Sequence, residues 1–135
     1  MGINTRMKKR EPIRSDVQLI ISDSTAKTIK LTVGRDPKDN SAVINGQLVD
    51  ISALGCCVES PLLLPTGVEL DVKIDATAIS KEAGQAHPDP IIAYSKTTAC
   101  VMKSAGGYRI GISFKNLPEQ DKAVIEALIK AREGR

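Results

Sequence analysis

"VELDVKI", residues 68–74, alternates strictly between apolar and charged side chains. A period of two is typical of a β-strand that has one face in the protein core and the other in water. Pro65 and Gly67, just before it, favour a turn, because proline fixes its own φ and glycine tolerates a positive φ. This stretch therefore predicts a sheet whose strands bury one face each.

A second stretch, GYRIGISF at residues 107–114, alternates in the same way. Its larger apolar side chains share one face, opposite Arg109, Gly111 and Ser113. The KSAGG sequence before it predicts a hairpin with the run at residues 91–102. Three further stretches rich in apolar or β-branched residues predict the remaining strands, at residues 17–22, 42–51 and 55–59.

Residues 117–131, LPEQDKAVIEALIKA, predict the one long helix. Pro118 suits the first helical position, and acidic residues in the first turn complement the positive end of the helix dipole. The helix carries an apolar stripe that must pack on the sheet, made of Val124, Ile125, Leu128 and Ile129. We therefore expect a mainly β fold, a six-stranded antiparallel β-barrel with this C-terminal helix across one open end.

Two segments interrupt this pattern. Residues 25–41 contain a dense turn signal and are expected to form a short extra hairpin. Residues 80–90 are polar and are expected to form a loop. The only histidine, His87, lies in that loop beside a proline, and we predict no metal-binding or catalytic role for it.

The composition is that of a single globular domain. The chain has 135 residues, of which 41% are hydrophobic and 26% charged, and no apolar run has the roughly 20 residues of a membrane helix. No secretory signal is evident, so we expect a cytoplasmic protein that does not insert into a membrane. We read Cys56, Cys57 and Cys100 as reduced thiols, and the adjacent pair as pointing to opposite faces of a strand. With one histidine, no glycine-rich phosphate loop and no glutamate pair in a cleft, catalysis is not expected.

The positive charge is concentrated at the beginning of the chain. The first 14 residues carry five basic side chains and one acidic one, a charge of +4, whereas the whole chain carries +3. A basic arm on a nearly neutral body favours an anionic partner, such as a nucleotide, a nucleic acid, a membrane surface or an acidic protein patch. A solvated tail is the simpler alternative.

The arm contains the spacing Arg-x-x-x-Arg twice, as Arg6 with Arg10 and as Arg10 with Arg14. Pro12 disfavours a helix here, so the arm is expected to be extended. Residues four apart on an extended chain point to one side with Cα atoms ~13 Å apart. Two arginines so placed can converge on one bulky anion, and a guanidinium fork suits both a phosphate and the O6 and N7 atoms of guanine.

A second polar motif, Asp-x-Ser-x-x-Gly, lies at Asp50, Ser52 and Gly55. Asp50 and Ser52 are expected to point to one side and Ile51 to the other, into the core, together with Leu54. Gly55 would supply a bend and permit close approach of a ligand. The alternative is a glycine-ended turn in which the polar side chains bond to their own backbone. The Asp50 carboxylate beside arginines would allow recognition of guanine, because the carboxylate accepts from the N–H groups of guanine, which arginine cannot do.

Taken together, KREPIRSDV, DISALG, LPTGVELDVKI, GGYRIGISF and the terminal amphipathic helix resemble a PilZ domain, the bacterial receptor module for cyclic di-GMP. The resemblance implies a barrel of the split-barrel PilZ type with a flexible basic N-terminal arm that folds over the ligand. It assigns residues 10–135 to one PilZ domain and residues 1–9 to a flexible basic segment. The implied ligand-binding residues are Arg10, Arg14, Asp50, Ser52 and Gly55, with Lys9 and Arg6 as additional candidates.

The resemblance places the first motif on Arg10 and Arg14 rather than on Arg6 and Arg10, because the first strand is expected right after Arg14. Lys9 lies where members of this family differ in taking one nucleotide or a stacked pair. The resemblance implies a cyclic di-GMP receptor that needs no cofactor and relays its signal to a protein partner through ordering of the arm. The alternative is an adaptor that binds a protein without nucleotide.

Nucleic-acid binding is disfavoured, because aromatic residues make up only 2% of the chain. Residues 25–41 and 80–90 are longer than the resemblance leads us to expect, and they could supply a partner surface.

Overall fold

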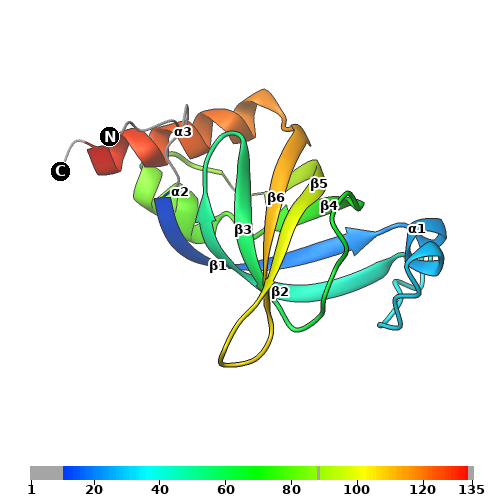
Figure 1. Cartoon of the computed structure of the whole chain (residues 1–135). Helices are drawn as coiled ribbons and strands as arrows, with labels where there is room; N and C mark the ends of the chain where they lie inside the picture. Colours follow the sequence, from blue (N-terminus) through cyan, green and yellow to red (C-terminus); the bar gives the residue numbers. More distant parts are fainter. Residues whose placement is uncertain (1–10, 88, 134–135) are drawn as a thin grey trace.

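The computed structural model describes residues 11–87 and 89–133, and its six strands form a closed antiparallel barrel in the order β1-β2-β3-β6-β5-β4 (Figure 1). The strands are β1 (Glu11–Ile21), β2 (Ala42–Ile51), β3 (Gly55–Ser60), β4 (Glu69–Ile74), β5 (Ile91–Met102) and β6 (Tyr108–Asn116). The helices are α1 (Asp23–Thr28), α2 (Thr77–Ala83) and α3 (Glu119–Glu133). The predicted six-stranded antiparallel barrel with a C-terminal helix is confirmed.

The alternating stretches form the strands that their periodicity predicts. In β4, Leu70, Val72 and Ile74 are buried, whereas Glu69 and Asp71 on the other face are exposed. β5 and β6 form the predicted hairpin, which projects at the bottom of Figure 1. Because one face of every strand points inward, the barrel interior is filled with aliphatic side chains.

α2 and α3 lie together at one end of the view in Figure 1, away from α1. Val124, Ile125 and Leu128 of α3 are buried in the same hydrophobic core as Ile79 of α2. The predicted apolar stripe thus packs as expected. α3 begins at Glu119, one residue after Pro118, which was predicted to be its first residue. The Pro118 carbonyl accepts from the N–H groups of two first-turn residues at 2.9 and 3.0 Å.

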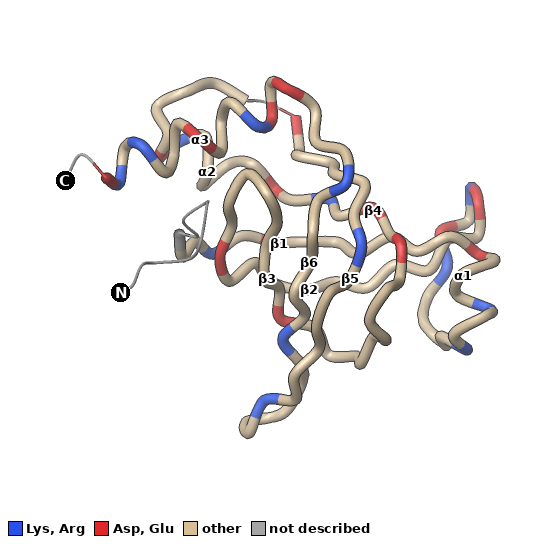
Figure 2. Tube along the Cα trace, turned by 45° about the horizontal axis from the view of Figure 1, so that its top comes forward, with Lys and Arg blue, Asp and Glu red and all other residues tan. Residues whose placement is uncertain are grey.

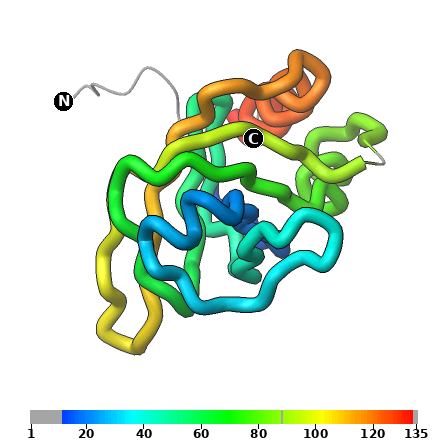
Figure 3. The backbone as a smooth tube through the Cα atoms, turned by 90° about the vertical axis from the view of Figure 1, so that its right-hand side faces the viewer, coloured from blue at the N-terminus to red at the C-terminus, as the bar shows by residue number. Residues whose placement is uncertain are grey.

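The segment predicted to form an extra hairpin contains helix α1 first and a tight antiparallel turn after it, in which the Asp36 N–H donates to the Ser41 carbonyl at 2.8 Å. Ser22, which was predicted to end the first strand, is the N-cap of α1, and its hydroxyl accepts from the Thr25 N–H at 3.4 Å. After α1 the chain returns to the barrel through a single bridge between Arg35 and Ala42. Arg35 donates to the Asp23 carboxylate at 2.9 Å and so holds this segment, which crosses the front of Figure 3, as a unit.

The predicted loop at residues 80–90 begins inside α2. The Asp75 carboxylate accepts from the Thr77 N–H at 2.9 Å, and Gly84 ends the helix with a φ of 70°. With only seven residues, α2 owes its stability to packing against α3 and β1 rather than to intrinsic propensity.

The first strand starts earlier than the sequence predicts. β1 begins at Glu11 rather than at residue 17, because β2 is long enough to pair with part of the basic arm, as in the register Pro12 with Asp50. A register shift between Pro12 and Ser15 interrupts this pairing. The arm is extended, as predicted, from residue 11 onward. The predictions for residues 1–9 and for Arg10 lie outside the described residues.

Candidate functional site

Arg14, the described arginine of the first motif, lies at the irregularity of β1. The register of β1 on β2 shifts between Pro12 and Ser15, so Arg14 stands on a bulge-like segment. Its side chain is 78% exposed, and its nearest ion-pair partner is the Glu59 carboxylate at 3.9 Å. At that distance and exposure the contact is weak, and Arg14 is free to reach a ligand. Arg6, Lys9 and Arg10 lie outside the described residues.

Asp50 of the second motif lies on β2 between the arm and β3. It is opposite Pro12 of β1 and opposite Cys57 of β3. Its neighbours Ile51 and Cys56 form a pair that is fully buried, so Asp50 and Cys57 lie on the outer face of the barrel. The prediction that the adjacent cysteines point to opposite faces is confirmed, because Cys56 is buried and Cys57 is partly exposed. None of the three cysteines, all of which the structure describes, forms a disulfide. The fold therefore brings the Asp50 motif next to the strand that carries Arg14.

Ser52 takes part in the turn that joins β2 to β3. Its side chain is buried, with 2% exposure, and its hydroxyl accepts from the Leu54 N–H at 3.1 Å. Its own N–H donates to the Gly55 carbonyl at 2.8 Å. This is the alternative considered above, a glycine-ended turn that satisfies its own polar groups. Ser52 is directed at this turn rather than at solvent.

Leu54 was predicted to face the core, and this prediction is wrong. Its side chain is 56% exposed. The Leu54 carbonyl accepts from the Phe114 N–H of β6 at 2.9 Å, which fixes the turn with its backbone against β6 and its side chain outward.

Gly55 is buried, and the reason for glycine here is the backbone of β6. A Cβ atom at this position would lie 2.1 Å from the Ile112 carbonyl oxygen and 3.3 Å from the Ser113 Cα. Real Cβ atoms essentially never come within 3.0 Å of another heavy atom. Close approach of a neighbouring strand is therefore a sufficient reason for glycine at this position, and the ligand contact predicted for Gly55 stays a prediction.

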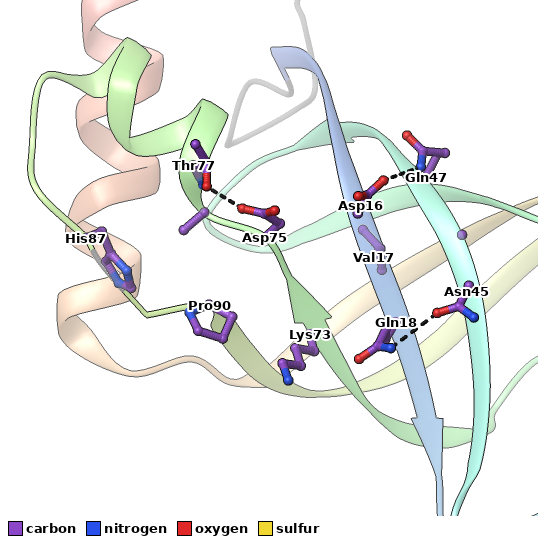
Figure 4. A pocket seen from close by; sticks show the side chains of 12 residues that line it. Asp16, Val17, Gln18, Asn45, Gln47, Lys73, Asp75, Thr77, His87 and Pro90 are labelled. Atoms are coloured by element: carbon purple, nitrogen blue, oxygen red, sulfur yellow. Dashed lines mark hydrogen bonds between the residues drawn. The ribbon is translucent and has the colours of Figure 1, made fainter. Parts of the chain in front are cut away.

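Among the described residues, two cavities on the outside of the barrel are candidate ligand sites. The larger, of about 730 Å³, lies over β1, β2 and the end of β4 (Figure 4). Hydrogen-bonded pairs line it, with Gln47 donating to Asp16 at 2.6 Å and Gln18 to Asn45 at 3.2 Å. Its lining carries the carboxylates of Asp16 and Asp75, the ammonium of Lys73 and the His87 ring, whose nitrogens are engaged with Asp121 and Asp89. It contains none of the predicted site residues that the structure describes.

The second cavity, of about 560 Å³, contains Arg14. Arginines from three elements line it, namely Arg14 of β1, Arg109 of β6 and Arg132 of α3, together with two glutamates. Cavity size alone would favour the other site, but an anionic ligand needs cations, so the smaller cavity is the better candidate. Elsewhere, basic and acidic residues are interspersed along the described part of the chain (Figure 2).

Glu59 of β3 is the central anion of this cavity. Lys103 lies 3.0 Å and Arg109 3.6 Å from its carboxylate, in addition to Arg14. The hydrogen bond from Lys103 is the main cause that holds the pKa of Glu59 below its usual value, and the charges of all three cations act in the same direction. The sequence reasoning missed Glu59, Lys103 and Arg109, although Arg109 was correctly expected on the outer face.

Arg132 has a structural role in the same cavity. It forms a two-pronged contact with the Glu82 carboxylate of α2, with Nη2 and Oε1 2.8 Å apart, and its Nη1 donates to the Pro12 carbonyl. These contacts join α3 and α2 to the start of β1. Arg132 is therefore engaged in positioning the arm, unlike the exposed Arg14.

His87, for which no role was predicted, lies against α3. Nε2 is 2.5 Å from the Asp121 carboxylate and Nδ1 is 2.7 Å from the Asp89 carbonyl. Carbonyl and carboxylate oxygens both accept hydrogen bonds, so the doubly protonated form of the ring can donate to both partners at once. Burial alone would lower the pKa of His87, but the hydrogen bonds to Asp121 and Asp89 and the charge of Asp121 raise it overall. The pair ties the segment before β5 to the first turn of α3.

Residues 11–87 and 89–133 contain no group of three or more His, Cys, Asp or Glu side chains placed to hold a metal ion. No helix among them is both long and apolar enough to cross a membrane.

This arrangement of barrel, helix and outer-face motifs corresponds to one family. Residues 4–131 match the model of the PilZ domain, and the chain therefore belongs to the PilZ domain family. A search of curated protein sequences found no match.

Solved structures share the fold at low sequence identity. The Bacillus subtilis inhibitor of motility, MotI/DgrA, has a TM-score of 0.67 at 15% identity, and the match covers 98% of this chain and 54% of that one. MrkH of K. pneumonia in complex with c-di-GMP has a TM-score of 0.61 at 16% identity, over 98% and 57% of the two chains. The PilZ domain of YcgR from Escherichia coli with c-di-GMP has a TM-score of 0.59 at 12% identity, over 98% and 95%. This chain thus spans about half the length of the first of these proteins and nearly all of the YcgR domain.

Proposed function

We propose that the protein is a cytoplasmic receptor for cyclic di-GMP that acts by binding and not by catalysis. Membership of the PilZ family and the presence of c-di-GMP in two structural neighbours support this proposal. The observation that carries it is the register of Pro12 with Asp50, which joins the two sequence motifs on adjacent strands.

In this proposal, Arg14 and Arg10 contact phosphates and guanine faces, and Asp50 accepts from the N–H groups of a guanine edge. Ser52 and Gly55 contribute by shaping the turn behind Asp50, since Ser52 is buried and Gly55 abuts β6. Lys9 and Arg6 remain additional candidates. Residues 10–135 would form the PilZ domain, and residues 1–9 a flexible basic segment.

Cyclic di-GMP would signal through the arm to a protein partner. Arg132 supports this route, because it contacts the Pro12 carbonyl and the Glu82 carboxylate and so connects the arm with both α2 and α3. Neutralising the charges of the arm would change how it sits on β2, and the two helices would change with it.

Isothermal titration calorimetry with cyclic di-GMP tests the proposal. We expect binding in the micromolar range or tighter, and its loss in Arg14→Ala. Lys38→Ala is the matched control, because Lys38 is an exposed cation in the loop after α1, outside the Arg14 cavity. No heat change with wild-type protein that has a normal circular dichroism spectrum would overturn the proposal. It would leave an adaptor that binds its partner without nucleotide.

A further inference from the structure

The Glu59 cluster, defined as Glu59 with Arg14, Lys103 and Arg109, gathers cations from three separate elements around one carboxylate. Arg14 comes from β1, Lys103 from the turn after β5, and Arg109 from β6. Three cations and one carboxylate leave a net charge of +2. A surface site with unbalanced positive charge attracts anions.

The three contacts with Glu59 differ in strength. Lys103 is the closest, at 3.0 Å, and its side chain is 30% exposed. Arg109 is 3.6 Å away and 54% exposed. Arg14 is 3.9 Å away and 78% exposed. Exposed pairs at such distances are screened by water and salt, so the two arginines can leave Glu59 for a better anion at little cost.

The cluster lies on the same face as Asp50. Asp50 of β2 is opposite Cys57 of β3. Glu59 follows Cys57 by two residues on β3, so Cys57 and Glu59 project outward on the same face, about 7 Å apart. On the other side of β3, Gly111 is opposite Cys57 and Arg109 is opposite Glu59. Gly111 has no side chain, so β6 contributes none between Asp50 and Arg109; the Thr98 hydroxyl of β5 lies over this position, 3.1 Å from where a Cβ atom of residue 111 would be.

We propose that Arg109 and Lys103 are further ligand contacts of the cyclic di-GMP site, and that Glu59 is their resident counter-anion. This inference rests on the proposed function. Cyclic di-GMP carries two phosphodiester groups with one negative charge each, which the net charge of +2 matches. When the nucleotide binds, its phosphates replace Glu59 as the partner of the arginines. Glu59 therefore weakens binding, whereas Arg109 and Lys103 strengthen it.

Calorimetric titration of cyclic di-GMP into matched variants tests this. Arg109→Gln is expected to weaken binding about tenfold, as is typical of a lost charge-assisted hydrogen bond, and Lys103→Gln severalfold. Glu59→Gln is expected to tighten binding about three- to tenfold. Each cation variant should also show a shallower dependence of affinity on salt. Lys38→Gln and Glu69→Gln make the same charge changes in the loop after α1 and on β4, and both should bind like the wild type.

The outcomes separate this inference from the proposed function. If the wild type binds and Arg14→Ala does not, but Arg109→Gln and Lys103→Gln bind like the wild type, only the inference is overturned. Weaker binding by Glu59→Gln would overturn the counter-anion role and indicate that Glu59 itself contacts the nucleotide. A folded wild type that does not bind overturns both. Thermal melting of every variant shows whether a loss of affinity is a loss of folding.

Discussion

Replacing Gly55 by alanine separates the structural from the ligand-binding explanation of the second motif. The new Cβ atom would lie 2.1 Å from the Ile112 carbonyl oxygen, whereas ordinary contacts begin at 3.4 Å. The obstacle is strand backbone, which cannot rotate away as a side chain can. β3 would have to move away from β6 by about 1 Å at this point, by comparison of these two distances.

The cost follows from what surrounds Gly55. It pairs with Ser113, and the next pair, Cys56 with Ile112, is buried in the core. Overpacking a closely packed site typically costs 1–3 kcal/mol. Because the backbones of two paired strands are forced apart, we expect the upper end, about 3 kcal/mol. For a domain of this size that corresponds to a fall in Tm of ~10 °C.

Urea denaturation followed by circular dichroism measures this change. Gly34→Ala is the matched control, because a Cβ atom at Gly34 meets nothing within 4 Å. It should leave the free energy of unfolding unchanged or raise it slightly, since alanine restricts the unfolded chain. If Gly55→Ala unfolds like the wild type and loses only its affinity for cyclic di-GMP, the structural explanation is refuted and the ligand explanation stands.

Three further predictions concern other parts of the fold. Because the pKa of His87 is raised in the folded state, its contribution to stability is complete below the unfolded value near 6.5 and is lost as pH rises through the folded pKa. His87→Gln should therefore flatten the decline in unfolding free energy above pH 6.5, which a pH series of denaturation curves measures. Leu54→Ser should change the free energy of unfolding by less than about 0.5 kcal/mol, since Leu54 is 56% exposed. A decrease of about 2 kcal/mol or more in urea denaturation would indicate that the Leu54 side chain packs in the core. Arg132→Ala should cost roughly 1–3 kcal/mol and speed hydrogen exchange at the start of β1, and unchanged exchange there would contradict its positioning role.

The strands were predictable because their periodicity is local. Val72 and Asp71 alternate across β4 as the sequence indicates, and no distant contact is needed to read that pattern. The short helices were not predictable in this way. α1 buries a single residue, Ala26, and α2 a single residue, Ile79, so neither has an apolar stripe. Their signals were the caps at Ser22 and Gly84, which also occur in turns.

Within the second motif, side-chain directions were predicted correctly inside β2, where successive side chains alternate between faces, and wrongly in the turn after it, where they do not. Asp50 and Ile51 lie on opposite faces of β2, as predicted, with Ile51 fully buried. At Ser52 the strand ends, and a turn closed by the Ser52 N–H and the Gly55 carbonyl follows. Beyond that point the period of two no longer sets side-chain direction, so Leu54 turns outward and Ser52 inward.

The Glu59 cluster shows a kind of site that local patterns do not reveal. Glu59 and Arg109 are 50 positions apart in the chain and face each other only because β3 pairs with β6 in one register. A shift of that register by one residue would turn Arg109 to the opposite face and leave Glu59 opposite Tyr108 or the buried Ile110. The close contact of Gly55 with Ile112 fixes the same pair of strands at its other end. In the proposed function, the glycine of the motif would therefore support cyclic di-GMP binding without touching the nucleotide, because it packs β3 against β6 in the register that brings Arg109 to Glu59.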